Sequence, residues 1–436
     1  MVNNIWHFPG DYQKKSREIL ETALNSIAGY RSWRAYDPGP DFPVDVRYAA
    51  MPVLKKKDIR EHTPRGFVPP GRDMQAGLDS GEISLVKTSG TTDVSVTNIW
   101  YQPWWDGSER ASWQLNSYVA KLASDSHPEA ILANPMNVGI ISDDIDLPME
   151  KRRLSRFLYL NEKSNPVAWV PALMDRMVRE LSIFRPVILE ANPSLLARLC
   201  RYLAASGQQV YQPGLIVFTY EYPTQLQIKQ IKRVFQSPLV SSYGSTETGY
   251  VFMQCEAGKF HQNSEGCRVD FQPLKKEHGG PDIGRILVTT FNNPWYYMVR
   301  FDVGDLVRID AEGKCTCGRN SGIILSAVEG RTLSNTLTCD GKLVTLRQAD
   351  NGLSELKGID EYRLEQTGEC QYDLYLVSGR TDRNQLEAEA SRVLQKLYGD
   401  KARFSFYYEN ALAPESSGKY CHIKALFPIV IEDYLE

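Results

Sequence analysis

The sequence has few of the features that mark membrane proteins, nucleic-acid-binding proteins or small disulfide-stabilised proteins. None of its apolar runs approaches the roughly 20 residues that a membrane-spanning helix needs. Its 50 lysines and arginines are balanced by 53 aspartates and glutamates, and the net charge of −3 offers no basic field to nucleic acid or an anionic membrane. Eight cysteines in 436 residues favour reduced thiols or a metal site over a disulfide framework.

The first residues of the chain also lack the basic and then apolar layout of a signal peptide. Together with the cysteine usage, this predicts a cytoplasmic protein. Hydrophobic residues make up 42% of the chain and charged residues 24%, which is ordinary for a globular protein. The length allows two or three domains of roughly 100–200 residues each. The sequence does not decide between a monomer and a homodimer.

Between residues 81 and 250, short apolar segments alternate with helical patterns. The expected strands are residues 81–87, 137–141, 187–189, 215–218 and 239–241. Leu195, Leu196, Leu199 and Leu203 share one face of an expected helix that begins near Pro193. Short strands separated by helices predict a parallel sheet covered by helices, and ligands bind beyond the carboxyl ends of such strands.

Two further regions follow. Closely spaced strand patterns and turns over residues 266–327 predict an antiparallel β subdomain, and a β-α-β pattern follows residue 330. We therefore expect an α/β fold with a large N-terminal domain, residues 1–330, that has parallel sheets covered by helices and the antiparallel subdomain. A small, mobile α+β domain is expected over residues 331–436.

A run of hydroxyl-bearing residues around one glycine interrupts the strand pattern at residues 81–87. This run is Thr88, Ser89, Gly90, Thr91 and Thr92. Backbone N–H groups and hydroxyls in such a loop can turn toward an anion, which is a way to hold triphosphate oxygens without a Walker-type lysine. Taken alone, most runs of this kind are ordinary surface loops.

Further motifs follow this loop in a fixed order. They are Tyr243 to Glu247 (YGSTE), Arg300 to Leu306 (RFDVGDL), Cys315 to Arg319 (CTCGR), Gly330-Arg331 and Ser417-Gly418-Lys419. In this order the motifs resemble those of the adenylate-forming superfamily, in particular its phenylacetate-CoA ligase-like branch, over roughly residues 80–425. Pro193-Ser194 and Tyr220-Glu221 agree more loosely.

The resemblance implies a two-step reaction. A small-molecule carboxylic acid attacks the α-phosphate of ATP and releases pyrophosphate, and the thiol of coenzyme A or of a phosphopantetheine arm on an acyl carrier protein then captures the acyl adenylate. Residues 95–118 are rich in Trp and Tyr, and these side chains are expected to line a pocket for an aromatic or bulky apolar acid. Ordinary packing of the N-terminal helices on the sheet explains them equally well. Two alternatives stay open, namely a catalytically impaired nucleotide-binding homologue and an enzyme that passes the acyl group to an amine.

The resemblance also implies roles for individual residues. Glu247 would be the Mg²⁺ ligand, on a loop between a strand and a helix. Tyr243 would lie against adenine, Asp305 would accept hydrogen bonds from the ribose hydroxyls, and Arg331 would contact ribose or phosphate. Lys419 would bridge the substrate carboxylate and the α-phosphate after the small domain rotates, as a compact ammonium on a long stem can do.

Thr246 is a third catalytic candidate beside Glu247 and Lys419. The other candidates for nucleotide binding are Thr88, Ser89, Gly90, Thr91, Thr92, Tyr220, Glu221, Ser242, Gly244 and Ser245. Without the resemblance, ordinary interpretations compete: Glu247 is typical of a helix start, Asp305 of a hairpin turn, and Lys419 of a solvated loop.

The cysteines provide a second candidate site. Cys315 and Cys317 form a Cys-x-Cys pair, and Cys255 and His261 lie upstream with a Cys-x5-His spacing. Three thiols and one imidazole would make a closed, structural Zn²⁺ site. Cys267 is a rival fourth ligand, and a pair of reduced thiols without metal is the alternative.

The sequence departs from the family pattern at two places. Asp93 follows the hydroxyl-rich loop where the family has glycine, and an aspartate repels pyrophosphate. The Gly330-Arg331 pair is followed by residues 332–335 (TLSN) and not by paired aspartates. Both departures favour the impaired homologue. The presence of Glu247, Asp305 and Lys419 argues against it.

Overall fold

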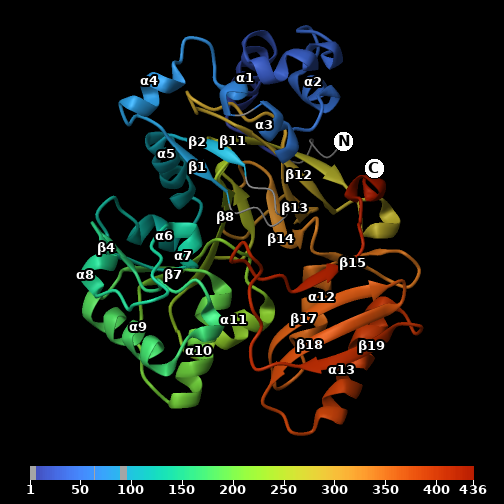
Figure 1. Cartoon of the computed structure of the whole chain (residues 1–436). Coiled ribbons are helices and arrows are strands. Elements are labelled where there is room, and N and C mark those ends of the chain that lie inside the picture. Colours follow the sequence, from blue (N-terminus) through green and yellow to red (C-terminus); the bar gives the residue numbers. More distant parts are fainter. Residues whose placement is uncertain (1–5, 63, 89–95) are drawn as a thin grey trace. The chain divides into compact units, whose positions relative to one another are not determined.

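The computed structural model describes residues 6–62, 64–88 and 96–436. The chain forms two compact units, one of residues 1–120, 242–273 and 284–327 and the other of residues 121–241, 274–283 and 328–436. The expected fold class is confirmed, since a largely parallel sheet with helices, antiparallel strands and a smaller α+β part are all present (Figure 1). The expected domain boundary at residue 330 stays a prediction.

The first unit begins with helices and a hairpin. The helices are α1 (Tyr12–Ser26), α2 (Val44–Ala50), α3 (Lys56–His62), α4 (Met74–Asp79) and α5 (Gln102–Trp113). Strand β1 (Ser84–Lys87) pairs antiparallel with β2 (Thr97–Trp100), so these strands hold the two ends of the hydroxyl-rich loop. Residues 89–95 of that loop lie outside the described residues.

The rest of the first unit is built from β-strands. They are the second half of β8 (Leu239–Ser245), β9 (Gly249–Gln254), β10 (Phe260–Gln262), β11 (Cys267–Pro273), β12 (Ile283–Thr290), β13 (Phe301–Ile309) and β14 (Ile324–Arg331), in the sheet order β11-β12-β13-β14-β10-β9-β8. The pairs β8–β9, β9–β10, β10–β14 and β11–β12 are antiparallel, as the closely spaced strand patterns predict.

The second unit contains the parallel sheet. Its strands are β3 (Glu129–Leu132), β5 (Phe157–Tyr159), β6 (Ile188–Ala191), β7 (Leu215–Phe218) and the first half of β8, all parallel, with β4 (Arg153–Leu154) antiparallel at one edge. Helices α9 (Pro171–Phe184), α10 (Pro193–Ser206) and α11 (Gln225–Lys232) pack against the sheet through a buried apolar core. The central strands are short and mostly apolar, as is typical of a buried parallel sheet.

The C-terminal part of the second unit has its own sheet and core (Figure 1). Strands β17 (Ile359–Gly368), β18 (Gln371–Ser378), β19 (Arg403–Tyr408) and β20 (Ile423–Ala425) pair in the order β19-β18-β17-β20. Helices α12 (Leu346–Leu353) and α13 (Arg383–Tyr398) and the hairpin of β15 (Asn335–Leu337) and β16 (Leu343–Thr345) complete it. Cys339 and Cys370 form a disulfide, which departs from the expectation of reduced thiols; their Cα atoms lie 5.0 Å apart, within reach of the bond.

One expected strand is wrong. Residues 135–138 form a short helix, α7 (Pro135–Val138), and the strand of this segment is β3, which ends before it. The Asn134 side chain accepts a hydrogen bond from Met136 N at 3.0 Å, and Pro135 stands at the first helical position. A capping asparagine followed by proline starts a helix, and this local signal prevails over the apolar residues that follow.

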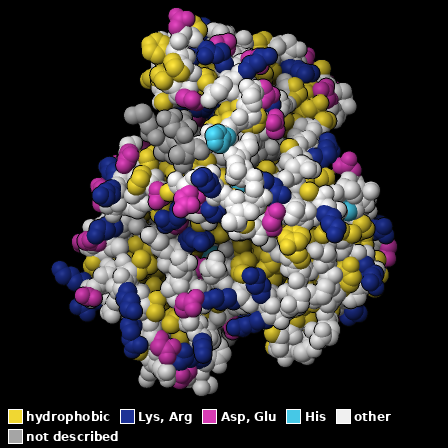
Figure 2. All heavy atoms as spheres, turned by 180° about the vertical axis from the view of Figure 1, so that it is seen from behind, with side chains coloured by type: hydrophobic (Ala, Val, Ile, Leu, Met, Phe, Trp, Pro, Cys, Tyr) yellow, Lys and Arg dark blue, Asp and Glu magenta, His cyan; other side chains and the backbone are white. Residues whose placement is uncertain are grey.

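Charged side chains of both signs are interspersed on the face drawn in Figure 2, in keeping with the near-neutral net charge. Among the described residues, no helix combines the length and apolar character that crossing a bilayer requires.

Candidate functional site

Two of the motifs meet through a hydrogen bond between Tyr243 and Asp305. Tyr243 lies on β8 and Asp305 on β13, and the phenol Oη donates to Asp305 Oδ2 at 2.7 Å. Phe252 on β9 packs edge-on against the Tyr243 ring, with 5.9 Å between ring centroids. The backbone beside Asp305 is shaped by Gly304, whose φ of +81° suits glycine. Both residues therefore stand on strands, and Asp305 is not in a hairpin turn.

The YGSTE segment lies in the β8–β9 hairpin, with Ser242 to Ser245 on β8 and Thr246 and Glu247 in its turn. The sequence predicted that Glu247 lies on a loop between a strand and a helix. That prediction is wrong, because the segment after the turn is strand β9, which begins at Gly249. A Cβ atom at Gly244 would lie 2.2 Å from Gly249 O, so only glycine allows the two strands to approach this closely.

Glu247 is buried in that turn beside a lysine that the sequence did not single out. Its side chain is 3% exposed, and Oε1 has no hydrogen-bond partner. Lys56, the first residue of α3, places Nζ 3.7 Å from this oxygen. Tyr296 Oη is also buried without a partner, and the pKa of Tyr296 is raised first by burial and then by the Glu247 charge. A buried carboxylate oxygen with spare lone pairs is suited to a hard cation.

The segment with Lys419 forms a tight turn in the second unit. Glu415 N donates to Lys419 O at 2.8 Å, and Gly418 N donates to Glu415 O at 2.8 Å. Gly418 has a φ of +77°, and a Cβ atom there would lie 2.7 Å from Asn134 Cγ. The turn thus packs against Asn134, just beyond the carboxyl end of β3.

Glu221, expected to bind nucleotide, contacts the residue after Lys419. Its Oε1 accepts a hydrogen bond from Tyr420 N at 2.7 Å, and its Oε2 accepts one from Ser194 Oγ at 2.9 Å. Tyr220 Oη donates to Glu190 Oε1 at 2.7 Å. The structure therefore brings the two loosely matching pairs of the sequence together with the lysine turn.

The remaining nucleotide-binding candidates lie at strand ends or outside the described residues. Thr88 directly follows β1, and its N donates to Val96 O at 2.9 Å, while Ser89, Gly90, Thr91, Thr92 and Asp93 lie outside the described residues. Arg331 ends β14 after Gly330, whose φ is +125°, and Ser334 N donates to Arg331 O at 3.0 Å. The roles assigned to these residues stay predictions.

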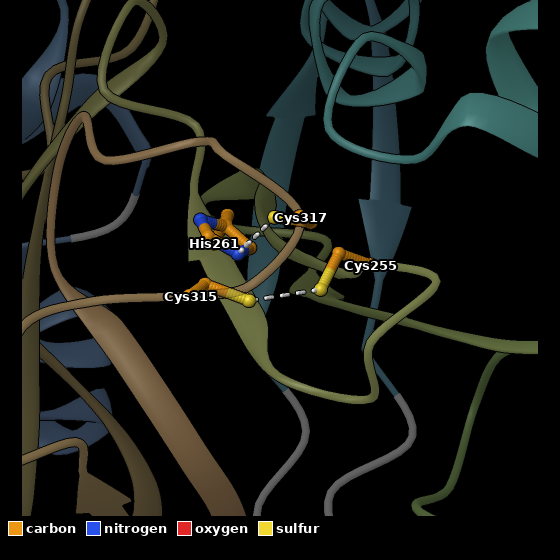
Figure 3. Close-up of side chains that lie close together, drawn as sticks. All are labelled: Cys255, His261, Cys315 and Cys317. Carbon is orange, nitrogen blue, oxygen red and sulfur yellow. Dashed lines mark hydrogen bonds between the residues drawn. The ribbon is translucent and has the colours of Figure 1, made fainter.

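The Cys/His candidates converge, as Figure 3 shows. Cys255 lies in the connection between β9 and β10, and His261 lies on β10. Cys315 and Cys317 lie in the loop between β13 and β14. The four ligand atoms lie within 4.8 Å of one another, with 3.6 Å between the sulfurs of Cys255 and Cys315 and 3.3 Å between Cys317 Sγ and His261 Nε2. Three sulfurs and a nitrogen at these separations fit a tetrahedral Zn²⁺ ligand set.

Burial sets the protonation of two members of this cluster. It raises the pKa of Cys255 to about 12 and lowers that of His261 to about 4. Cys267, the rival ligand, is not part of the group, and its Sγ donates to Asn263 O at 3.5 Å. Arg319 extends from the same loop to Glu256, at 3.0 Å, and thereby joins the two ligand-bearing segments a second time.

The aromatic segment packs largely on itself and on β9. The rings of Trp100 and Trp105 lie 4.4 Å apart, and Trp105 lies 5.0 Å from Tyr250. Trp104 Nε1 donates to Phe291 O at 2.9 Å. These contacts correspond to the packing alternative, and an aromatic or bulky acid as substrate stays a prediction.

No family model and no curated protein matches the sequence. Among solved structures, 2-hydroxyisobutyryl-CoA ligase in the postadenylation state with an acyl-AMP gives a TM-score of 0.70 at 15% identity, covering 95% of this chain and 88% of that chain. The same ligase in an open conformation with acyl-AMP and CoA gives 0.57 at 15% identity, covering 96% and 91%. Anthranilate CoA ligase AuaEII with anthranoyl-AMP gives 0.54 at 12% identity, covering 78% and 66%.

The fold is thus that of the adenylate-forming acid–CoA ligases, as the ordered motifs of the sequence imply. The fold is similar to that of 2-hydroxyisobutyryl-CoA ligase over nearly the whole length of the chain.

Proposed function

We propose that this chain is an AMP-forming acid–thiol ligase, which activates a small carboxylic acid with ATP and transfers the acyl group to coenzyme A. The observation that carries the proposal is the 2.7 Å hydrogen bond between Tyr243 and Asp305. It joins two motifs, 62 residues apart, to which the sequence resemblance assigns the same nucleotide. The fold shared with ligases that hold an acyl-AMP supports the same conclusion.

In the first step a carboxylate oxygen attacks the α-phosphorus, and the bond to the β-phosphate breaks so that pyrophosphate leaves. The two reactants are both anions, so their repulsion is the main barrier to approach, and preorganised positive charge is usually the largest catalytic contribution. Lys419 would supply that charge at the carboxylate and α-phosphate. Asp305, held by Tyr243 Oη, would accept hydrogen bonds from the ribose hydroxyls and fix the nucleotide.

Mg²⁺, when bound, would neutralise phosphate charge. Glu247 fits such an ion because its Oε1 is buried and makes no hydrogen bond. Lys56 Nζ lies 3.7 Å from that oxygen and would compensate the carboxylate while no metal is bound. Thr246, next to Glu247 in the same turn, would direct its hydroxyl toward the phosphates.

In the second step the thiolate attacks the carbonyl carbon of the adenylate, and AMP leaves. Coenzyme A and a phosphopantetheine carrier present the same thiol. The similar fold of a ligase that holds acyl-AMP and CoA supports coenzyme A as the acceptor, and the experiment below distinguishes the two. For the acid we keep an aromatic or bulky apolar compound, which the Trp-rich segment supports only weakly because several of its rings pack on one another and on β9. A Zn²⁺ ion in the Cys/His cluster would have a structural role, because four protein ligands leave no open position.

The test is AMP release measured with ATP, Mg²⁺ and a panel of aliphatic, hydroxylated and aromatic acids. AMP formation that requires both one acid and coenzyme A supports the proposal. Parallel reactions with a phosphopantetheinylated carrier protein, with an amine and with hydroxylamine identify the acceptor. Acid-dependent release only with the amine would replace the thiol ligase by an amide-forming enzyme, and release with no acceptor or acid at all would overturn the proposal.

A further inference from the structure

The two carboxylate oxygens of Glu221 are both used within the second unit. Oε1 accepts from Tyr420 N at 2.7 Å, and Oε2 accepts from Ser194 Oγ at 2.9 Å. The Ser194 hydroxyl in turn accepts from Gln227 Nε2 at 2.9 Å. Hydrogen bonds to an ionised acceptor are among the stronger ones in proteins. The carboxylate therefore links the start of α10 to the turn that carries Lys419.

Glu221 is held in place by its own backbone. Glu221 N donates to Thr219 O at 2.8 Å, across Tyr220, which has a φ of +69°. This is a classic γ-turn, a rare and strained conformation for a residue other than glycine. The half-buried Tyr220 side chain is anchored there by its Oη, which donates to Glu190 Oε1. The turn directs the Glu221 side chain to Tyr420 N.

Gln227, which donates to Ser194, has a fixed orientation as well. Gln227 belongs to the capping box of α11, in which Thr224 N donates to Gln227 Oε1 at 2.9 Å and Gln227 N donates to Thr224 Oγ1 at 3.2 Å. Its amide nitrogen is left to donate to Ser194. The helix start thus orients the hydroxyl that supports Glu221.

What Glu221 holds is the peptide bond between Lys419 and Tyr420. The N–H of that peptide donates to Glu221, and its C=O accepts from Glu415 N at 2.8 Å. A planar peptide with both polar groups engaged has a fixed orientation. Tyr420 adds an anchor, since its ring packs against the apolar core of the second unit. The Cα atom of Lys419 is consequently held from both sides.

We propose that Glu221 is a positioning residue that latches the Lys419 turn, and not a nucleotide contact. Only the kinetic consequence of this proposal rests on the proposed function. A latched turn presents the lysine for the first half-reaction, and the latch has no part in the attack of the thiol on an adenylate already made. Loss of the latch slows adenylation and leaves the thioester half-reaction unchanged.

The direct test is amide hydrogen exchange over residues 415–422 of the full-length protein without substrates. Glu221→Ala is compared with wild type and with a matched control, Glu355→Ala, which removes an exposed carboxylate of the same unit that pairs with Lys229. We expect exchange in this segment to rise about tenfold or more in Glu221→Ala only, with all three proteins folded and unfolding cooperatively in urea. Unchanged exchange in this segment overturns the proposal.

The second readout is kinetic. For Glu221→Ala we expect kcat for adenylation to fall about tenfold to a hundredfold, with KM for ATP within twofold of the wild-type value. The variant should convert supplied acyl-AMP and coenzyme A to thioester at the wild-type rate. Glu221→Gln, which keeps one acceptor oxygen, should fall between. A raised KM for ATP at unchanged kcat would make Glu221 a nucleotide contact and overturn the latch. If wild type activates no acid, the proposed function fails, and hydrogen exchange alone decides the latch.

Discussion

Tyr243 donates a 2.7 Å hydrogen bond to Asp305, and this contact ties β8 to β13 at the point where two sequence motifs meet. The phenol holds the Asp305 carboxylate through Oδ2. An aspartate that binds ribose hydroxyls must be held at a fixed angle, and a charge-assisted hydrogen bond does this better than packing alone.

We expect Tyr243→Phe to raise KM for ATP about tenfold at unchanged kcat, since a hydrogen bond to a charged group contributes about 1.5–3 kcal/mol and not all of it reaches the ligand. Asp305→Asn should have the larger effect. Tyr250→Phe on neighbouring β9 is the control, because it removes a hydroxyl that donates to Glu109 Oε1 at 3.3 Å. Equal KM values in Tyr243→Phe and wild type would remove Asp305 from the nucleotide site.

Lys56 compensates the buried charge of Glu247. Replacing it, as in Lys56→Gln, leaves a carboxylate that is 3% exposed without its cation, at a cost of about 1–3 kcal/mol in the free energy of unfolding. Millimolar Mg²⁺ should restore much of this loss, because the ion would take the place of the ammonium. Thermal unfolding with and without Mg²⁺ measures both. Lys57→Gln is the control, and an equal loss in that variant would show that the pairing is unimportant.

The Cys/His cluster predicts one Zn²⁺ per chain, measured by plasma mass spectrometry on protein purified without added metal. Cys315→Ser should lose the ion and lower the unfolding temperature, because metal binding contributes directly to folding. Cys267→Ser should keep the ion, since Cys267 lies outside the group of four. Wild-type protein without zinc, or zinc lost only in Cys267→Ser, would contradict this ligand set.

Glu162 is the centre of a buried ionic network in the second unit. It is 0% exposed and accepts from Arg176 at 2.6 and 2.5 Å, with Arg152 Nε 3.7 Å away. Glu162→Gln leaves Arg152 and Arg176 with Glu180 as their remaining carboxylate partner, so we expect a loss of about 1–3 kcal/mol in urea unfolding. Glu18→Gln on an exposed face of α1 should change stability by less than about 0.5 kcal/mol. A loss below about 1 kcal/mol for Glu162→Gln would show that water or relaxation compensates the network.

Local signals in the sequence predict much of the fold. The leucine stripe after Pro193 predicts α10, because hydrophobic periodicity acts over a few residues. The same reasoning fails at residues 137–141, where the cap at Asn134 starts a helix that the apolar pattern does not reveal. Antiparallel strands after residue 266 are predicted from their spacing and turns.

The sequence predicts some contacts of the candidate site and misses others. The Cys/His ligands converge as expected, since metal-ligand chemistry leaves a visible spacing. Lys56 has no such signal, because residues 55–57 are all lysines and only the tertiary fold selects one of them. The contact of Glu221 with Tyr420 spans 199 residues and involves a backbone N–H, which no side-chain pattern can indicate.

The central claim is that this chain makes an acyl adenylate, and isotope exchange between pyrophosphate and ATP tests it most directly, since exchange reports the first half-reaction without any acceptor. The account predicts exchange that depends on at least one acid of the panel and that falls about a hundredfold or more in Lys419→Ala. Exchange that proceeds equally without acid, or no exchange with any acid in protein that binds ATP, would contradict it.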